Sequence, residues 1–195
     1  MKFKKIISSI IPHFYFLSLI IIFSPVLQAQ NEAESHCQWG IEYDLMAPRI
    51  GAWNSVNLSG SLGHGRTKHS LVLAHIEIND RHLTDESFQE DELNALGYRF
   101  EIYSHRDLKK WSTGFLMLYT RDDVVTSANA QRGNFNSFFV GVPFGYTWVL
   151  KKKLTINPGI NILVPLTNRK IKIGLDEVEQ APWGLEPGIR IGYRF

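Results

Sequence analysis

The chain has 195 residues, of which 44% are hydrophobic and 21% charged, and its formal net charge at pH 7 is +2. This length suffices for one domain and leaves no room for a second. The charge balance lacks the concentrated basic face that nucleic-acid binding requires, and the single cysteine, Cys37, cannot form an internal disulfide.

Residues 1–29 have the pattern of a secretory signal peptide: a basic start, a short apolar core and small residues before a cleavage site. We expect cleavage after Ala29, which lowers the basic count from 21 to 18 against 19 acidic residues. The alternative is a retained membrane anchor, but Pro12 and His13 interrupt the apolar run, which is short for a spanning helix. Residues 30–38 are then expected to form a periplasmic N-terminal segment.

The rest of the chain alternates apolar and polar residues between turn residues, which is the pattern of half-buried β-strands. Eight strands are predicted, at residues 39–47, 54–63, 69–79, 93–104, 111–120, 137–150, 153–165 and 182–195. No second run of about 18 apolar residues exists, so strands closing on themselves are the remaining way to span a membrane. The predicted fold is all-β, an eight-stranded antiparallel up-and-down transmembrane β-barrel over residues 39–195.

The predicted connections alternate between short and long. Short turns are expected at residues 64–67, 105–110 and 151–153, longer connections at 80–92, 121–136 and 166–181, and an intermediate one at 48–53. This order is typical of a barrel with both termini in the periplasm and its long loops outside the cell. Within residues 166–181 the alternation continues, which predicts a hairpin that extends beyond the membrane.

The last predicted strand alternates most strictly. One face carries glycines with Glu186, Arg190 and Arg194, and the other is apolar and closes on Tyr193 and Phe195. This segment resembles the last strand of outer-membrane β-barrels, and the whole of residues 37–195 resembles in architecture the membrane domain of OmpA-like and other small outer-membrane proteins. The resemblance implies that Tyr193 and Phe195 form the signal read by the barrel-insertion machinery.

Alternation alone does not say which face points inward. A secreted lipocalin-like carrier also has eight antiparallel strands, but its apolar face lines a ligand cavity. The membrane arrangement is favoured because Trp39, Trp111 and Trp148 gather with Tyr193 and Phe195 at one set of strand ends, as an aromatic girdle does. The polar face is also rich in Gly, Ser and Asn, which suits a crowded interior.

A lumen of eight strands is only wide enough for side chains to fill it. The charged and polar residues predicted to form an interior network are Glu42, His75, Glu77, Arg99, Glu101, Glu186 and Arg190. Because the first and last strands must pair, Glu42 is expected near Arg190, and by the same adjacency His75 or Glu77 near Arg99. The network either fills and rigidifies the barrel or lines a narrow, gated water or ion path.

The assignment of faces is less clear in two strands. In the third and fifth strands, the nominal inner face carries Leu71, Leu73, Leu116 and Leu118. An apolar inner face conflicts with the polar lumen that the other strands predict. The sequence therefore leaves the registers of these two strands open.

The histidines bear on whether the chain is a lipid-acyl hydrolase. The lipid A deacylase family carries a His-x-Ser-Asn motif late in the chain, whereas no histidine here has a serine two residues on and none follows His105. The adjacent His69 and Ser70 would point to opposite faces of a strand. No catalytic residue, metal site or cofactor is predicted, although a lipid-acyl hydrolase stays open as an alternative.

The acidic connection at residues 80–92 matches no calcium-loop spacing and is interpreted as a solvated surface. We expect a structural or surface-binding outer-membrane protein that acts through its outer loops. The expected partners are outer-membrane lipids, lipopolysaccharide and the insertion machinery, without nucleic acid, and the expected state is a monomer.

Overall fold

The computed structural model describes residues 37–50, 55–78, 88–167, 170–179 and 181–195. The predicted signal peptide, the segment up to residue 36 and most of the connection at residues 80–92 lie outside the described residues and stay predictions. No helix in the described part has the length and apolar character to cross a membrane.

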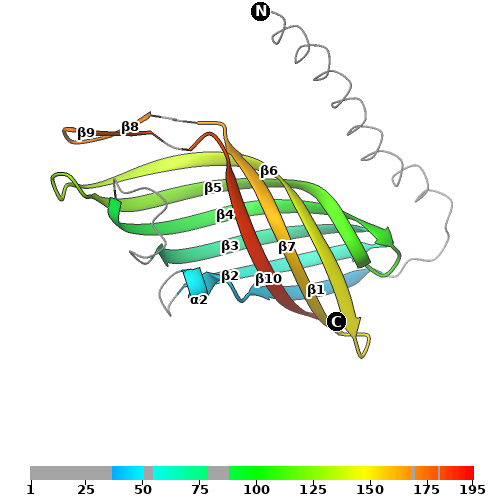
Figure 1. Cartoon of the computed structure of the whole chain (residues 1–195). Helices are drawn as coiled ribbons and strands as arrows, with labels where there is room; N and C mark the ends of the chain where they lie inside the picture. The colour runs from blue at the N-terminus through cyan, green and yellow to red at the C-terminus, as the bar shows by residue number, and fades with distance from the viewer. Residues whose placement is uncertain (1–36, 51–54, 79–87, 168–169, 180) are drawn as a thin grey trace, which may run out of the picture. The chain divides into compact units, whose positions relative to one another are not determined.

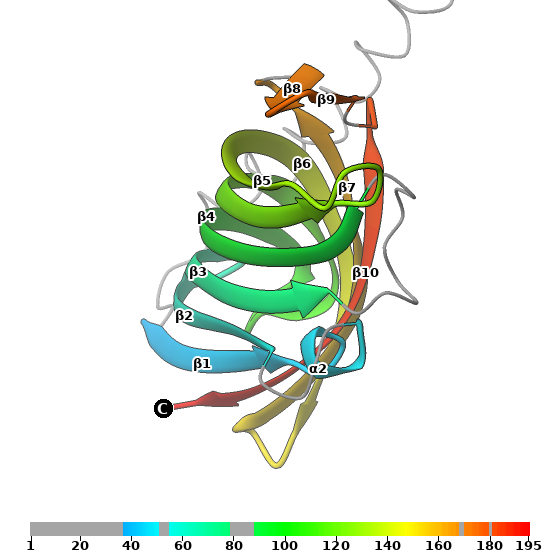
Figure 2. The same ribbon diagram turned by 90° about the vertical axis from the view of Figure 1, so that its left-hand side faces the viewer.

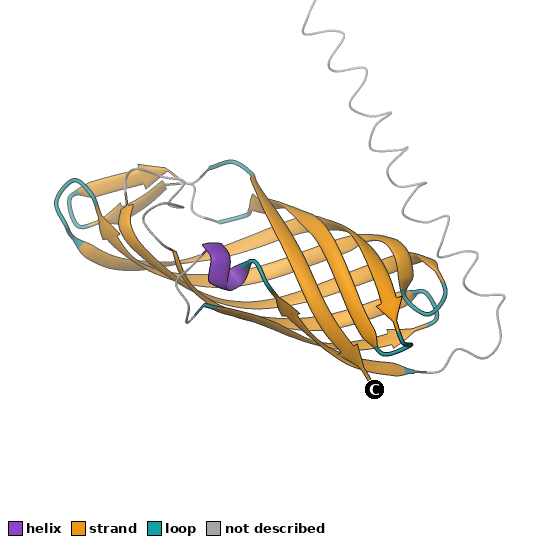
Figure 3. Ribbon diagram, turned by 60° about the horizontal axis from the view of Figure 1, so that its bottom comes forward, coloured by secondary structure: helices purple, strands orange, loops and turns teal. Residues whose placement is uncertain are grey.

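Eight antiparallel strands close into a barrel, in the order β1-β10-β7-β6-β5-β4-β3-β2 (Figure 1). The elements are β1 (Gln38–Asp44), α2 (Ala47–Ile50), β2 (Val56–His64), β3 (Thr67–Ile78), β4 (Phe88–His105), β5 (Lys109–Thr126), β6 (Arg132–Leu150), β7 (Leu154–Pro165), β8 (Lys170–Ile173), β9 (Asp176–Glu179) and β10 (Gly184–Arg194). The pairing of β1 with β10 closes the barrel, with Glu42 opposite Gly192. The predicted eight-stranded up-and-down topology is confirmed, and the strands wrap obliquely around the barrel axis in Figure 3.

Three short turns join β2 to β3, β4 to β5 and β6 to β7 at one end of the barrel, near the C-terminus (Figure 1). They lie where the sequence predicts them, and each contains left-handed backbone: Gly65 has φ of 60°, Asp107 of 59° and Lys151 of 47°. Such tight turns fix the register of the strands that they join. We call this end the short-turn end and the opposite one the open end.

The wall of the barrel is higher on one side, because β4, β5 and β6 have 18, 18 and 19 residues while β1 has 7. Figure 2 shows these long strands stacked beside the shorter ones. The predicted loop at residues 121–136 is wrong in extent, since β5 continues to Thr126 and β6 begins at Arg132. Val124 and Phe135 continue the alternation there and belong to a small apolar cluster, which keeps the chain extended.

The hairpin predicted within residues 166–181 is present as the separate two-stranded sheet β8–β9. Its turn contains Gly174, whose φ of 59° suits glycine. Ile171 and Ile173 are buried against Val124 and Phe135, so the hairpin packs on the tall wall of the barrel.

The apolar face of the strands points outward. Large apolar side chains are exposed on all eight barrel strands: Trp39, Ile41, Leu58, Leu71, Leu73, Leu96, Phe115, Met117, Phe144, Ile160, Ile162, Leu185 and Tyr193. The buried residues on the opposite faces are mostly polar, including Thr147, Thr155 and Asn157. The predicted orientation, apolar outside and polar inside, is therefore confirmed, and it is the reverse of a lipocalin-like carrier.

The two strands whose registers were open differ from each other. On β3, Leu71 and Leu73 are exposed on the outer face, so the even-numbered residues point inward. On β5, Leu116 is almost fully buried in the interior and Leu118 lines the same space. The nominal inner face is thus wrong for β3 and confirmed for β5.

Candidate functional site

The centre of the site is a cluster of four buried charged residues inside the barrel, Glu42, Lys68, Glu101 and Arg190, which we call the ionic cluster. Lys68 Nζ lies 2.9 Å from Glu42 Oε1 and 2.8 Å from Glu101 Oε2. Arg190 Nη2 lies 3.1 Å from Glu101 Oε1, and Arg190 Nη1 lies 3.6 Å from Glu42 Oε2. Each cation therefore contacts both carboxylates, and the four charges sum to zero.

Neutral polar side chains complete this layer. Arg190 also donates a 2.6 Å hydrogen bond to Asn157 Oδ1, and Asn157 in turn bonds Thr147. Ser112 Oγ donates to Glu101 Oε1 at 3.4 Å. Since buried charges are tolerated only when paired and hydrogen-bonded, these partners explain how four ions persist in the interior.

A cap closes the barrel between the ionic cluster and the short-turn end. Leu108, in the β4–β5 turn, is buried against Gly63, where an added Cβ would meet Leu108 Cδ1 at 2.3 Å. Arg194 holds this turn by donating to the carbonyl oxygen of Leu108 at 2.7 Å. The space left beside Glu42, Lys68 and Leu108 is about 10 Å³, which is about the smallest cavity that holds one water molecule.

Of the seven predicted interior residues, the structure brings Glu42, Glu101 and Arg190 together, and the expected contact of Glu42 with Arg190 is present. Arg99 lies one two-residue step above Glu101 on β4, since Arg99 pairs with Ser70 and Glu101 with Lys68. Glu186 is half-buried and accepts a 2.7 Å hydrogen bond from Asn161 Nδ2. Both therefore face the interior, as expected.

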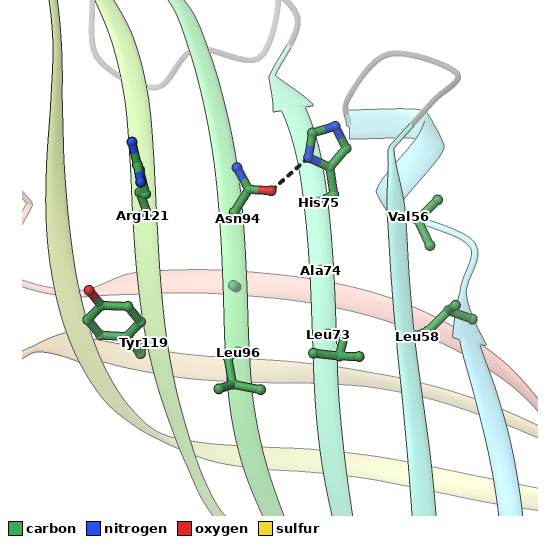
Figure 4. Close-up of a pocket in the computed structure, with 10 residues that line it drawn as sticks. Val56, Leu58, Leu73, Ala74, His75, Asn94, Leu96, Tyr119 and Arg121 are labelled. Atoms are coloured by element: carbon green, nitrogen blue, oxygen red, sulfur yellow. Dashed lines mark hydrogen bonds between the residues drawn. The ribbon is translucent and has the colours of Figure 1, made fainter.

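The other two predicted interior residues, His75 and Glu77, belong to the outer face. Their side chains are 38% and 41% exposed, because the reversed face assignment of β3 carries them outward with Leu71 and Leu73. His75 Nδ1 lies 2.9 Å from Asn94 Oδ1 rather than near Arg99, five residues further along β4 (Figure 4). The expected contact of His75 or Glu77 with Arg99 is therefore wrong.

Lys68 is the ionic residue that sequence reasoning missed. The predicted turn ended at residue 67 and the predicted third strand began at residue 69, so Lys68 was assigned to neither, whereas β3 begins at Thr67. The signal was present in Leu71 and Leu73, because placing these two leucines outward turns the even-numbered residues, Lys68 among them, inward.

Above Arg99, toward the open end, the interior contains a cavity of about 270 Å³. Most of its inward-pointing lining side chains are apolar: Val72, Ala74, Ile76, Ile78, Leu93, Ala95, Leu116, Leu118, Phe139 and Leu163, together with Asn57 and Thr120. Arg99 and Glu186 are its charged lining residues. We call it the apolar cavity.

Figure 4 shows where the outer face changes character. Leu58, Leu73, Leu96 and Tyr119 lie at one level, and His75, Asn94 and Arg121 lie above them on β3, β4 and β5. Arg121 Nε lies 3.5 Å from Asp123 Oδ2 on the same exposed face. The apolar band of the outer face therefore ends between these two levels.

Beyond the band, Asp91 on β4 and Asp122 on β5 are largely buried. Burial, with the nearby Asp122 carboxylate, raises the pKa of Asp91 to about 7. Burial also raises the pKa of Asp122 to about 6, although Thr120 opposes this by donating a 2.8 Å hydrogen bond to it. These two groups change charge in the neutral range, whereas ordinary aspartates do not.

The hydrogen bonds of His69, His75 and His105 go to partners other than serine. His69 points outward and contacts the Tyr98 hydroxyl at 2.6 Å, while the adjacent Ser70 is buried inside. His75 and His105 hydrogen-bond to Asn94 and to the backbone oxygen of Arg106. Within the described ranges, no group of three or more metal-binding side chains is found.

No family model matches the chain, and no curated protein sequence matches it. Among solved structures, the fold is similar to the N-terminal β-barrel domain of Pseudomonas aeruginosa OprF, with a TM-score of 0.48, 11% identity, and coverage of 83% of this chain and 100% of that one. It is also similar to Neisserial surface protein A, with a TM-score of 0.44, 8% identity, and coverage of 81% and 92%. A closed eight-stranded barrel with an apolar outside and a charged inside is the architecture of small outer-membrane β-barrels.

Proposed function

We propose that the chain is an outer-membrane β-barrel that is closed to solutes and acts through its outer surface and its connections at the open end. The observation that carries this proposal is the exposed apolar band that runs over all eight strands around an ionic interior. In water such a band would be a large exposed apolar surface, whereas in lipid it is matched by the surrounding hydrocarbon. The closed barrel also gives each of its eight strands two hydrogen-bonded neighbours, as lipid demands.

The short-turn end faces the periplasm in this proposal. It carries the C-terminus and the exposed aromatic residues Trp39, Trp111 and Trp148, with Tyr193 and Phe195 in an edge-on ring contact at 5.3 Å. Aromatic rings of this kind gather at membrane interfaces. The opposite headgroup level then lies at His75, Asn94 and Arg121, where lipopolysaccharide and other outer-leaflet lipids would meet polar side chains.

The lumen is closed by the ionic cluster and the cap. Conduction would require Leu108 and Arg194 to leave the short-turn end and the four paired charges to separate. We therefore expect no ion conductance from the purified full chain in planar lipid bilayers. Steady single-channel steps in the wild-type protein would show that the cluster opens and would favour the gated path instead.

Fractionation tests the membrane assignment. The full chain, expressed in a Gram-negative host, is expected in the washed outer-membrane fraction, with an electrophoretic band that migrates faster before boiling than after. A soluble periplasmic protein without a heat shift would refute the proposal, since the apolar band would then be exposed to water.

The last strand is proposed to carry the insertion signal. Phe195 donates its backbone N–H to the Trp39 carbonyl oxygen at 2.9 Å, so the final residue still belongs to the seam that closes the barrel. We expect Phe195→Ser to reduce the assembled fraction several-fold, with Leu175→Ser on the exposed β8–β9 turn as the control. Undiminished assembly of Phe195→Ser would refute the terminal signal without affecting the membrane assignment.

A further inference from the structure

The apolar cavity lies inside a barrel whose outer face is already apolar. Its lining residues Val72, Leu116 and Ile76 point away from the outer band, so the hydrocarbon of a membrane does not cover them. A location in the membrane therefore does not account for these inward-facing apolar side chains. Packed protein interiors also rarely contain a void of this size.

Arg99 lies at the floor of the cavity, and its charge is not balanced by a direct partner. The residue is only 4% exposed, and its Nε has no hydrogen-bond partner. Among the described residues no ion pair to Arg99 is found: the four charges of the ionic cluster below it already sum to zero, and Glu186, the other charged residue of the cavity lining, attracts Arg99 only from beyond ion-pair distance. A buried cation without a direct counter-ion is costly, so a guanidinium in this position favours an anion beside it.

We propose that the apolar cavity binds a single-chain lipophilic carboxylate, with its carboxylate on Arg99 and its hydrocarbon chain among the apolar lining residues. The planar guanidinium offers two parallel N–H donors that match the two oxygens of a carboxylate. A pocket that is mostly apolar, with a few polar groups that orient the ligand, is the usual form of a small-molecule site.

The volume limits the ligand to one chain. An apolar protein cavity of about 150 Å³ accommodates a benzene ring of six carbons, so the cavity of about 270 Å³ corresponds to a chain of about eight to ten carbons. Entry must come from the open end, since the ionic cluster and Leu108 close the other end. A two-chain lipid does not fit this volume.

Glu186 is the second charged group of the lining and opposes an anionic ligand. It is held by Asn161, and no ion pair joins it to Arg99 among the described residues. A bound carboxylate would therefore be attracted by Arg99 and repelled by Glu186, so changing either residue should move the affinity in opposite directions. A cavity that selects only for apolar surface would respond to neither.

Binding is measured with the full chain in detergent-free phosphatidylcholine nanodiscs. Decanoate labelled with ¹³C at its carboxyl group is titrated and followed by its NMR signal, with empty nanodiscs of the same composition subtracted. We expect one saturable site for decanoate and at least tenfold weaker binding of decan-1-ol, which has the same chain without the charge.

Four variants separate the proposed contacts. Arg99→Met removes the guanidinium and should weaken decanoate binding at least tenfold, while Glu186→Gln should tighten it several-fold. Ala95→Phe places a ring in the cavity and should abolish binding with Arg99 intact. Arg121→Met is the matched control, because Arg121 is an exposed arginine on the outer face and its loss should change the affinity less than twofold.

Folding of each variant is checked by the heat shift of its electrophoretic band. If Arg99→Met does not fold, Glu186→Gln, Ala95→Phe and decan-1-ol still decide the question. Decanoate uptake no greater than in empty nanodiscs, equal affinity for decan-1-ol, or unchanged affinity in folded Arg99→Met would overturn the proposal. This inference rests on the proposed membrane barrel but not on a role for the outer loops. If the protein is in the outer membrane and its band shifts on heating but it does not bind decanoate, the ligand proposal is refuted and the proposed function is not.

Discussion

The two halves of the barrel interior solve the same packing problem in different ways. Near the short-turn end the lumen is filled by the ionic cluster and the cap, which leave only about 10 Å³ unoccupied. Toward the open end, residues of β2 to β7 and β10 enclose about 270 Å³ between mostly apolar side chains. At both levels the length of the inward-pointing side chains decides how much of the lumen is filled.

This difference indicates that the filled half contributes most to stability and that the hollow half has room for a ligand. The filled half contains long charged side chains that reach across the lumen to several strands, and it joins β1, β3, β4 and β10. The hollow half contains branched and small residues that stop short of the axis. We expect substitutions in the filled half to change the free energy of unfolding strongly and those in the hollow half to change it weakly.

The largest expected effect is that of Glu101→Gln, because Glu101 is 1% exposed and contacts both Lys68 and Arg190. Leaving two buried cations with one carboxylate should lower the free energy of unfolding by about 3–5 kcal/mol. Urea unfolding in lipid vesicles, followed by tryptophan fluorescence, measures the loss. Glu77→Gln is the control on the outer face and should cost less than about 1 kcal/mol. Equal effects of the two variants would mean that water reaches the ionic cluster.

The second effect concerns the pair that closes the barrel. Arg190→Glu places three carboxylates around Lys68 and should destabilise the barrel strongly, and adding Glu42→Arg should restore part of the loss. The coupling is expected to be about 1–3 kcal/mol, and it is incomplete because Arg190 also bonds Glu101 and Asn157. Strictly additive losses in the double variant would remove the proposed coupling of Glu42 with Arg190.

Adding one carbon to a side chain in each half tests how tightly each half is packed. In Gly192→Ala the new Cβ would meet Thr155 Oγ1 at 2.6 Å and Glu42 Cγ at 2.8 Å, so the filled half should lose about 1–3 kcal/mol. Val72→Ile adds a methylene group toward the apolar cavity and should change the free energy of unfolding by less than about 1 kcal/mol. A large loss from Val72→Ile would mean that the cavity is filled in the folded protein.

The smallest expected effect is a dependence of stability on pH, which comes from Asp91 between the apolar cavity and the open end. Because the pKa of Asp91 is raised to about 7 in the folded state, protonated Asp91 is favoured by folding. Its contribution to stability is fully present below pH about 4 and is lost as the pH rises through about 7. Asp91→Asn should therefore increase the free energy of unfolding by about 1–2 kcal/mol at pH 8 relative to wild type, and should have little effect at pH 4.

Asp123→Asn, which removes a carboxylate from the exposed face of β5, is the control for this variant. An Asp91→Asn variant whose advantage over wild type is the same at pH 4 and pH 8 would contradict the assignment of the titration to Asp91.

Much of the fold could be predicted from residue alternation. On β4, β7 and β10, the polar residues that alternate with apolar ones, such as Arg99, Asn157 and Arg190, lie on the inner face as expected. The three short turns, which contain Gly65, Asp107 and Lys151, fall where the alternation is interrupted. The extent of β5 and β6 was underestimated because Arg121, Asp122 and Asp123 look like a solvated loop. In the structure the continued pairing of these strands with each other and with β4 keeps that stretch extended.

The candidate site was only partly predictable. Glu42, Glu101 and Arg190 could be identified as interior charges because their strands alternate cleanly, whereas Lys68 lay at the edge of a turn. His75 and Glu77 lie on the same strand as Lys68, and their predicted placement was wrong. Assigning the odd-numbered instead of the even-numbered residues of β3 to the inner face moves every side chain of the strand to the other side of the barrel wall.

The sequence by itself determined the eight strands, their order along the chain and the two residue sets on most of them, because side-chain direction in a strand follows from a period of two residues. Only the tertiary structure decided which set faces outward on β3, how Lys68 meets carboxylates from β1 and β4, and that the open end contains a cavity beside Arg99. These features depend on the pairing register and closure of the barrel, which bring together residues that no local pattern connects.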